Sequence, residues 1–212
     1  MTTPTAPHQG QPVLHYGAPI ENARRVAIFI HGRGASAEDI LGIAPELGTD
    51  DVAYLAPQAA GNTWYPYSFL SPIPQNEPNL SSALNVVAEL VAKIASGGHS
   101  SERVIILGFS QGACLGLEFA ARNARRYAAV IALSGGLIGP PGTPRDYPGA
   151  MLGTPVFLGC SDIDPHIPLE RVHESADVFR RIGARVDERI YQRMGHTINA
   201  DELAAVRELV RE

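Results

Sequence analysis

The stretch "ILGFSQGAC", residues 106–114, decides which fold this chain can adopt. Its apolar, β-branched start leads directly into "GFSQG" (108–112), and a helical pattern follows. A serine between two glycines, where a strand ends and a helix begins, requires a very tight turn. We therefore predict a strand–turn–helix unit that holds the Ser110 hydroxyl out at the carboxyl end of the strand.

Similar apolar runs recur along the chain and alternate with amphipathic stretches. Most of these runs are apolar enough to be covered on both faces of a sheet. The runs predicted to form strands are 26–30, 52–56, 103–108, 128–133, 155–159 and 185–191. Strict alternation of strands with helices predicts the α/β class, with a mainly parallel sheet and helices on both of its faces.

Capping residues and apolar faces mark the helices. Ser36 followed by Asp39 is typical of a capped helix start, and we expect that helix to end near Gly48. Asn199 and Glu202 give the same signal for the last helix. Two further helices are indicated by apolar faces at helical spacing, formed by Ala83, Val87, Leu90, Val91 and Ile94 and by Leu169, Val172, Ala176, Phe179 and Ile182.

The length of 212 residues suits one well-buried core and is short for two. Residues 1–12 are polar and Pro-rich, so we expect a disordered tail there and a single domain over 13–212. The tail lacks the apolar stretch of a signal peptide, and no segment approaches the roughly 18 apolar residues of a membrane span. The sequence therefore predicts a cytoplasmic protein without stable membrane association.

The charge is mild, with a net value of −5 and no run of Lys or Arg. This balance argues against a nucleic acid or an anionic membrane surface as partner. We expect a small-molecule partner, and the sequence leaves a homodimer open. Cys114 and Cys160 fall inside predicted core elements, where thiols are typically inert.

Two long connections interrupt the alternation of strands and helices. They are residues 57–79, with "NTWYPYSF" inside, and residues 134–153. Compact domains seldom keep loops of this length without a use. Because ligands collect at the carboxyl ends of parallel strands, we expect both connections to form walls of a binding site there.

A serine hydroxyl becomes a good nucleophile only when a neighbour takes its proton. His196 follows the last predicted strand and precedes a capped helix, which places it at the same sheet edge as Ser110. It is the predicted base. The histidines that we interpret as solvated or structural are His8, His15, His99 and His173.

An acid is needed to orient that base, and hydrolases with this turn carry it between the serine and the histidine in chain order. "GCSDIDPHIP" (159–168) offers Asp162 and Asp164 just past a predicted strand. These two carboxylates and His166 could also form a weak metal site. No further ligand pattern accompanies them, so we predict no metal.

The negative oxygen of a tetrahedral intermediate needs hydrogen-bond donors. Two backbone N–H groups commonly supply them, one after the nucleophile and one in the loop after an early strand. The Gly-rich loop "FIHGRGAS" (29–36) fits the second role, so the predicted donors are the amides of Gln111 and Arg33. His31 would then hold this loop, with a second catalytic role left open.

The motifs together resemble the phospholipase/carboxylesterase branch of the α/β-hydrolases, which includes acyl-protein thioesterases. The likeness runs from about residue 13 to the end of the chain. The motifs that carry it are "HGRGAS" (31–36), "GFSQGA" (108–113), "ALSGG" (132–136), "DIDPHIP" (162–168) and "MGH" (194–196). The resemblance implies an α/β-hydrolase fold without a large lid, and no cofactor.

The resemblance also assigns roles to individual residues. The family acid lies in a segment of the form D-P-x-V/I-P, which selects Asp164 over Asp162. Thioesterases that act on lipidated proteins usually have "HGLGD" where this chain has "HGRGA" (31–35). The family's acyl pocket is lined by the region that here carries the rings of Trp64, Tyr65, Tyr67 and Phe69.

Both features favour a serine carboxylesterase that hydrolyses small esters through an acyl-enzyme on Ser110. Thioester or lysophospholipid hydrolysis by the same machinery is a close alternative. A non-catalytic homologue that only binds a ligand or a partner protein is an alternative of another class. It is disfavoured because such homologues usually lose one of the three catalytic residues, all of which this chain keeps.

Overall fold

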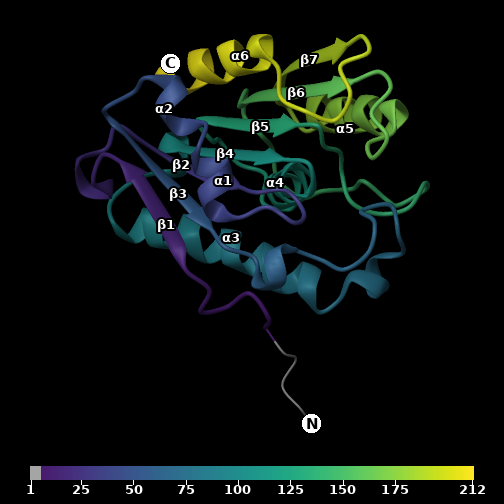
Figure 1. The fold of residues 1–212 in the computed structure, drawn as a ribbon, viewed down its shortest axis with the longest axis horizontal. Helices are drawn as coiled ribbons and strands as arrows, with labels where there is room; N and C mark the ends of the chain where they lie inside the picture. The colour runs from purple at the N-terminus through teal and green to yellow at the C-terminus, as the bar shows by residue number, and fades with distance from the viewer. Residues whose placement is uncertain (1–5) are drawn as a thin grey trace.

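A seven-stranded sheet forms the centre of the computed structural model, which describes residues 6–212 (Figure 1). The strand order is β1-β3-β2-β4-β5-β6-β7, and every pairing is parallel except that of β1 with β3. The strands are β1 Val13–Gly17, β2 Arg25–Ile30, β3 Val52–Pro57, β4 Val104–Phe109, β5 Ala129–Leu133, β6 Pro155–Ser161 and β7 Arg185–Tyr191. The predicted α/β class is confirmed, as are all six predicted strands.

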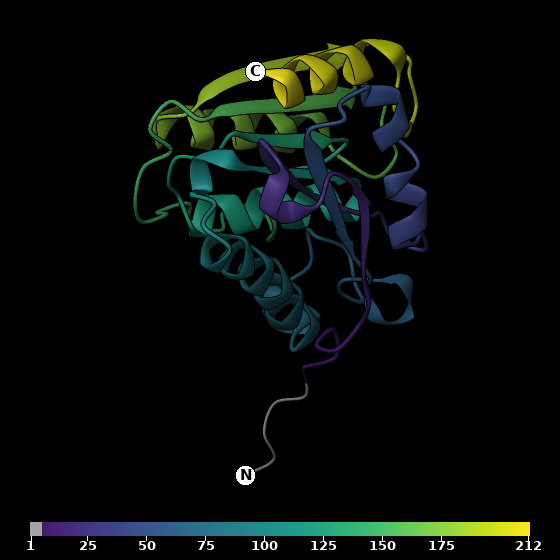
Figure 2. The ribbon, with the colours of Figure 1, turned by 90° about the vertical axis from the view of Figure 1, so that its left-hand side faces the viewer.

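Within residues 6–212, six α-helices cover the two faces of the sheet (Figures 1 and 2). Helices α3, α4 and α5 pack on one face, and α1, α2 and α6 pack on the other. The helices are α1 Ala37–Leu41, α2 Ala44–Leu47, α3 Asn79–Ser96, α4 Gln111–Arg122, α5 Leu169–Arg181 and α6 Ala200–Arg211. No helix within residues 6–212 combines the length and the apolar character needed to cross a membrane.

Strand β2 shows why the central strands are apolar throughout. Its alternate side chains enter different cores: Ile28 and Ile30 pack on the α3 and α4 side, and Phe29 packs on the α1 and α6 side. All three side chains are completely buried. Because a central parallel strand is covered on both faces, it contains a continuous apolar run, which is the signal that the sequence carries.

The sequence does not predict the first strand, β1. It lies at the edge of the sheet with both faces largely exposed, and it pairs with β3 in the antiparallel direction. An edge strand with exposed side chains needs no apolar run, so "VLHYG" (13–17) gives little strand signal.

The helix predicted from Ser36 to Gly48 is wrong in its length. The capping box of Ser36 and Asp39 is present, but α1 ends before Gly42 and a separate α2 follows. Pro45 stands at the start of α2. Proline lacks an N–H and clashes with the carbonyl four residues earlier, so one continuous helix cannot pass through this position.

The prediction of a disordered tail over residues 1–12 is wrong for the part that the structure describes, residues 6–12. His8 is 1% exposed, and its Nε2 lies 2.9 Å from the Trp64 carbonyl oxygen. The Ala60 N–H donates to His8 Nδ1 and the His8 N–H donates to Ser82 Oγ. Ser82 Oγ also donates to Gln9 Oε1, and the Gln58 N–H donates to the Pro12 carbonyl oxygen. The buried histidine and these two contacts attach the polar segment to the domain. Residues 1–5 lie outside the described part.

Candidate active site

The predicted catalytic residues lie together at the carboxyl edge of the sheet. Ser110 directly follows β4, while Asp164 and His196 lie in the loops after β6 and β7. These strands are parallel, so their carboxyl ends face the same way. The sheet order thereby brings Ser110 and His196, which are 86 positions apart in the sequence, into direct contact.

The turn at Ser110 has the tight geometry that the sequence predicts. Ser110 has φ 55° and ψ −118°, a conformation that L-residues rarely adopt. A Cβ on Gly108 would lie 2.3 Å from the backbone of Gly112, and one on Gly112 would lie 2.1 Å from the carbonyl oxygen of Ile30. Gly108 is therefore required for β4 and α4 to pass this closely, and Gly112 is required for α4 to approach the end of β2.

A continuous chain of hydrogen bonds joins the three side chains. His196 Nε2 lies 2.8 Å from Ser110 Oγ, and His196 Nδ1 lies 2.7 Å from Asp164 Oδ2. Proton transfer from serine requires the tautomer with the proton on Nδ1, which donates to the carboxylate and leaves Nε2 as the acceptor. The Asp164 side chain is fully buried and that of His196 is 18% exposed. This arrangement fits a nucleophile, a base and an orienting acid.

Asp164 is held in its charged form. Burial alone would raise the pKa of this carboxyl, but hydrogen bonds from His196 and from the backbone N–H groups of His166 and Ile167 lower it below its usual value. Those N–H groups lie 2.8 and 3.0 Å from Asp164 Oδ1. An ionised carboxylate can orient the imidazole and stabilise the imidazolium that forms during the reaction.

The neighbouring Asp162 holds the loop that carries the histidine. Its Oδ1 accepts a hydrogen bond from the Arg193 N–H at 2.7 Å, and Ser161 Oγ accepts one from the Gly195 N–H. The carboxylate that is hydrogen-bonded to His196 Nδ1 is that of Asp164 and not that of Asp162. The part of the chain that the structure describes contains no group of three or more His, Cys, Asp or Glu side chains arranged to hold a metal ion.

The two predicted oxyanion donors flank the serine. Gln111 is the first residue of α4, and the first N–H groups of a helix have no partner inside it. The Arg33 N–H finds no acceptor among residues 6–212. Its neighbour Gly32 passes so close to the serine that an added Cβ would lie 3.4 Å from Ser110 Cβ. Arg33 and Gln111 thus border the same cavity as the nucleophile and come from separate segments.

His31 has a structural role in the loop beside the serine. Its ring is completely buried, with Nδ1 2.8 Å from the Gly32 carbonyl oxygen and Nε2 accepting from the Ala59 N–H at 3.1 Å. Burial lowers the pKa of this imidazole. Both nitrogens are engaged, which leaves neither free for proton transfer with a substrate.

A cavity of ≈ 440 Å³ opens above the serine. Of the four predicted pocket residues, Tyr65, Tyr67 and Phe69 line it. Its remaining lining residues are Gly32, Arg33, Ala35, Pro66, Ser68, Phe109, Ser110, Gln111, Cys114, His166, Ile167 and His196. The connection 57–79 therefore forms a wall of the site, as the sequence predicts.

Trp64 lies outside this lining. Its ring is completely buried, and its indole N–H donates to the His31 carbonyl oxygen at 2.9 Å. The ring centroid lies 5.0 Å from that of His31 and 5.4 Å from that of His8. The indole therefore joins three segments of the core, and the neighbouring tyrosine faces the cavity instead.

The side chains of Gln111 and Arg33 hold the aromatic wall in place, although the sequence predicts a role only for their backbone N–H groups. Gln111 Oε1 accepts from the Trp64 N–H at 2.9 Å, and Gln111 Nε2 donates to the Tyr65 carbonyl oxygen at 2.8 Å. The Arg33 guanidinium donates to the carbonyl oxygens of Pro66 and Tyr67. No sequence pattern shows which loop such side chains reach, so these contacts could not be predicted.

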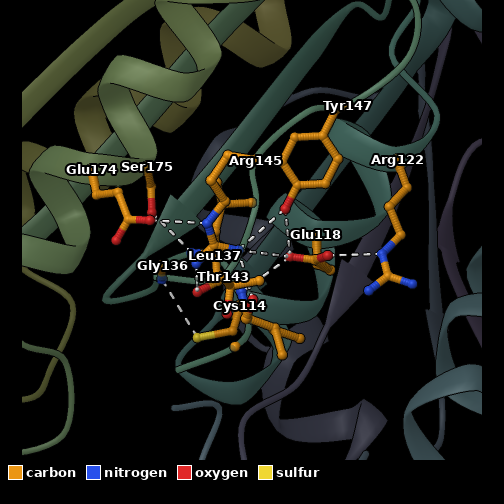
Figure 3. Close-up of polar contacts among 12 residues, drawn as sticks. Cys114, Glu118, Arg122, Gly136, Leu137, Thr143, Arg145, Tyr147, Glu174 and Ser175 are labelled. Atoms are coloured by element: carbon orange, nitrogen blue, oxygen red, sulfur yellow. Dashed lines mark hydrogen bonds and ion pairs between the residues drawn. The ribbon is translucent and has the colours of Figure 1, made fainter. Parts of the chain in front are cut away.

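The second long connection, 134–153, contributes no residue to the cavity lining. It packs on α4 and α5 through a buried polar network around Glu118 (Figure 3). The Glu118 carboxylate accepts from the Ile138 N–H and from the Tyr147 hydroxyl, both at 3.1 Å. The Gly139 N–H donates to the Phe69 carbonyl oxygen at 2.7 Å. This connection therefore acts on the cavity from behind, by supporting Phe69 and through the Gly136 N–H, which lies 3.5 Å from the Sγ of cavity-lining Cys114.

Both cysteines carry free thiols. Burial raises the pKa of Cys114 to about 12 and that of Cys160 to about 12. Cys114 lines the cavity, and Cys160 Sγ lies 3.8 Å from Asp164 Oδ2. A thiol that stays protonated is a poor nucleophile, so the structure agrees with the interpretation of both as inert.

Comparisons with known proteins give the family. Residues 15–212 match the family model for phospholipase/carboxylesterase. Acyl-protein thioesterase 1 of Saccharomyces cerevisiae is 27% identical, over 94% of this chain and 97% of its own length. The crystal structure of a phospholipase/carboxylesterase from Dyadobacter fermentans superposes with a TM-score of 0.92 at 40% identity, covering 100% of this chain and 99% of that one.

A more distant structure agrees in fold alone. The Bacillus cereus carboxylesterase has a TM-score of 0.75 at 16% identity and covers 96% of this chain and 94% of its own. The match of the family model to nearly the whole chain decides the assignment. This chain belongs to the phospholipase/carboxylesterase family of α/β-hydrolases and is a carboxylic ester hydrolase.

Proposed function

We propose that this protein is a serine carboxylesterase that hydrolyses small carboxylic esters through an acyl-enzyme on Ser110. The single observation that carries the proposal is the continuous hydrogen-bonded chain from Asp164 through His196 to Ser110, which ends at the wall of the cavity. Nucleophile, base and orienting acid each lie within reach of the next, as this chemistry requires.

The first half of the reaction forms the acyl-enzyme. Ser110 Oγ attacks the ester carbonyl carbon while its proton passes to His196 Nε2. The carbonyl oxygen becomes negative and accepts from the N–H groups of Gln111 and Arg33. When the intermediate collapses, the bond to the alcohol oxygen breaks and His196 returns the proton to it, so the alcohol leaves and the acyl group stays on Ser110.

The second half repeats these steps with water. His196 takes a proton from a water molecule, the hydroxide attacks the acyl carbon, and the Ser110 oxygen leaves with the proton that His196 returns. The carboxylic acid is released and the serine is regenerated. Ionised Asp164 stabilises the imidazolium in both halves.

Thioester or lysophospholipid hydrolysis is the second candidate. The similarity to a yeast protein named acyl-protein thioesterase 1 supports it. The aromatic side chains of Tyr65 and Phe69 in the cavity support the small-ester function instead, because they limit the space for a long acyl chain. Matched oxygen esters and thioesters of acetyl to palmitoyl chains separate the two, since a rise in kcat/KM up to palmitoyl would favour the thioesterase.

Labelling with a fluorophosphonate tests the proposal directly. The probe reacts with an activated serine, so we expect one adduct, located on Ser110 by peptide mass spectrometry, and none in Ser110→Ala. Ser68 also lines the cavity. A Ser68→Ala variant should still be labelled. An unlabelled wild-type protein would contradict the proposal and support a binding protein without catalysis, and an adduct on Ser68 would contradict the assignment of the nucleophile.

A further inference from the structure

Arg33 is the one permanently charged residue among those that line the cavity. Its side chain is exposed, and no carboxylate of residues 6–212 lies within 4.0 Å of its guanidinium. The chain as a whole has a net charge of −5. A cation without a counter-ion at the mouth of an acidic protein's active site calls for a functional explanation.

The side chain is nevertheless held in place. Nη1 donates to Thr63 Oγ1 at 3.1 Å and to the Pro66 carbonyl oxygen at 2.9 Å, while Nη2 donates to the Tyr67 carbonyl oxygen at 2.7 Å. These three acceptors are neutral, so they fix the guanidinium without balancing its charge. Its Cζ lies 6.0 Å from the centroid of the Tyr65 ring, another wall of the cavity.

The Arg33 guanidinium has hydrogen-bond donors that these contacts do not use. A guanidinium has five N–H donors, and the contacts to Thr63, Pro66 and Tyr67 use three of them. The two that remain are on the neighbouring nitrogens Nε and Nη2. Two adjacent N–H groups with a positive charge match the two oxygens of a carboxylate, the geometry in which Arg binds anions most strongly.

The position of Arg33 relates this charge to the reacting ester. Its backbone N–H is a proposed oxyanion donor, so the same residue would bind the scissile carbonyl oxygen and carry a cation toward the wall formed by residues 65–67. Because Arg33 and Ser110 line the same cavity, an ester substituent that extends from Ser110 along this wall would approach the guanidinium. A neutral or cationic substituent would leave the charge unpaired.

We propose that the Arg33 guanidinium forms a carboxylate subsite and that the preferred substrates are esters with a carboxylate in the acyl or the alcohol part. This inference rests on the proposed function and narrows its substrate class. The competing explanation is that Arg33 only supports the loop 63–67. A supporting role would affect all esters alike, whereas a subsite discriminates by substrate charge, so the two explanations predict different results.

The test compares charged and neutral esters of the same shape. For the acyl side, mono-4-nitrophenyl adipate is paired with the amide analogue in which a carboxamide replaces the carboxylate. For the alcohol side, 4-acetoxybenzoate is paired with 4-acetoxybenzamide. We expect kcat/KM of the wild-type protein to favour the anionic member by about tenfold in one pair, the effect of a charge-assisted, bidentate contact. The pair in which the anionic member is preferred shows whether the subsite binds a carboxylate in the acyl part or in the alcohol part of the ester.

Variants of Arg33 connect the preference to this side chain. Arg33→Gln removes the charge but keeps an N–H donor for the loop, so the anionic-to-neutral ratio should fall to about one whatever happens to the absolute rates. Arg33→Lys keeps the charge without the planar fork and should retain part of the ratio. The control is Arg125→Gln, which makes the same charge change beyond the far end of α4, about 18 Å along the helix, and should keep the full ratio.

Three outcomes would overturn the inference. They are equal rates for both members of each pair in the wild-type protein, an unchanged ratio in Arg33→Gln, and hydrolysis of 4-nitrophenyl acetate without hydrolysis of any paired ester. All three leave the proposed function standing. If 4-nitrophenyl acetate also stays intact and the fluorophosphonate leaves Ser110 unlabelled, the proposed function itself has failed.

Discussion

Asp162 and Asp164 are two positions apart, yet the structure gives them different neighbours. Asp164 Oδ2 contacts His196, while Asp162 Oδ1 contacts the backbone N–H of Arg193. The sequence placed both carboxylates at the correct sheet edge, because both follow the apolar run of β6. It could not choose between them by pattern alone, since the pattern does not show which side chain is buried beside His196.

Exchanging each carboxylate for an amide tests the assignment of the acid. Asp164→Asn offers the imidazole an N–H, which favours the wrong tautomer of His196, so turnover of a 4-nitrophenyl ester should fall on the order of 10⁴-fold. Asp162→Asn keeps an oxygen that can accept from the Arg193 N–H, so it should cost far less. The reverse ranking of the two turnover numbers would move the orienting role to Asp162.

Glu202 has a buried carboxyl group whose pKa is raised. The sequence predicts its capping contact with Asn199, which is present, but not its burial against β6. Glu202 is completely buried, and its Oε1 finds no hydrogen-bond partner within the described residues. A Cβ on Gly159 would lie 2.2 Å from this oxygen. Burial is the main cause that raises the pKa of Glu202 to about 7.

This raised pKa makes stability depend on pH. The folded protein binds the Glu202 proton more tightly than the unfolded chain, whose carboxyl has a pKa near 4.5. The free energy of unfolding is therefore expected to fall as pH rises from about 4.5 through about 7, by up to about 3 kcal/mol from this group. Glu202→Gln should remove that part of the decrease.

Urea unfolding at pH 5 and pH 8 measures the effect. The wild-type protein should lose more unfolding free energy between the two pH values than Glu202→Gln does. Glu208 lies exposed on the same helix, so Glu208→Gln provides the matched control and should retain the wild-type pH dependence. An equal pH dependence in Glu202→Gln and the wild-type protein would show that Glu202 titrates normally.

At the scale of elements, the loop 63–69 combines core and cavity functions that the sequence does not separate. The sequence predicts that all of its aromatic side chains line the cavity, because a cluster of aromatic residues in a long loop does not show where each ring points. The structure places Trp64 in the core and Phe69 at the cavity. The orientation of the Trp64 ring depends on partners distant in sequence, His8 and His31, which pack against the indole.

Replacing Trp64 or Phe69 by alanine separates the core function of this loop from its cavity function. Trp64→Ala should lower the free energy of unfolding by about 3–5 kcal/mol, the usual cost of removing a large buried aromatic side chain, and leave the order of preference among acyl chains as it is. Phe69→Ala should instead shift the preferred chain in a 4-nitrophenyl ester series from about two to six carbons toward longer ones, because it enlarges the cavity.

The chain-length series and urea unfolding, done on both variants, check this prediction. A shift of the preferred length in Trp64→Ala with no loss of stability would show that the indole, and not Phe69, borders the acyl chain. The wild-type series serves as the reference for both variants.

Elements with a local signal, such as an apolar run or a capping box, could be predicted, and β1, which gives little such signal, could not. The six strands from β2 to β7 and the capped starts of α1 and α6 follow from local patterns. The connection 134–153 was expected to line the site, but it covers α4 and α5 through contacts such as that of Arg145 with Glu174 at 2.9 Å. Such long-range pairing of polar side chains leaves no periodic signal in the sequence.

At the scale of the whole molecule, the sheet order creates the site. Ser110, Asp164 and His196 come from three loops that are distant in sequence but meet at one edge of a parallel sheet. The parallel direction follows from the alternation of strands and helices, so the meeting of these loops could be predicted. The packing of α6 on β5 and β6, which buries Glu202, emerges only from the folded structure.

The central claim is that Ser110 and His196 act as one catalytic unit, and a double-mutant cycle tests it most directly. The measurement is kcat for a 4-nitrophenyl ester in the wild-type protein, in Ser110→Ala, in His196→Ala and in the double variant. Members of one unit are strongly non-additive. We predict that each single substitution removes almost all activity and that the double variant loses no more. Losses that multiply in the double variant would contradict a shared mechanism.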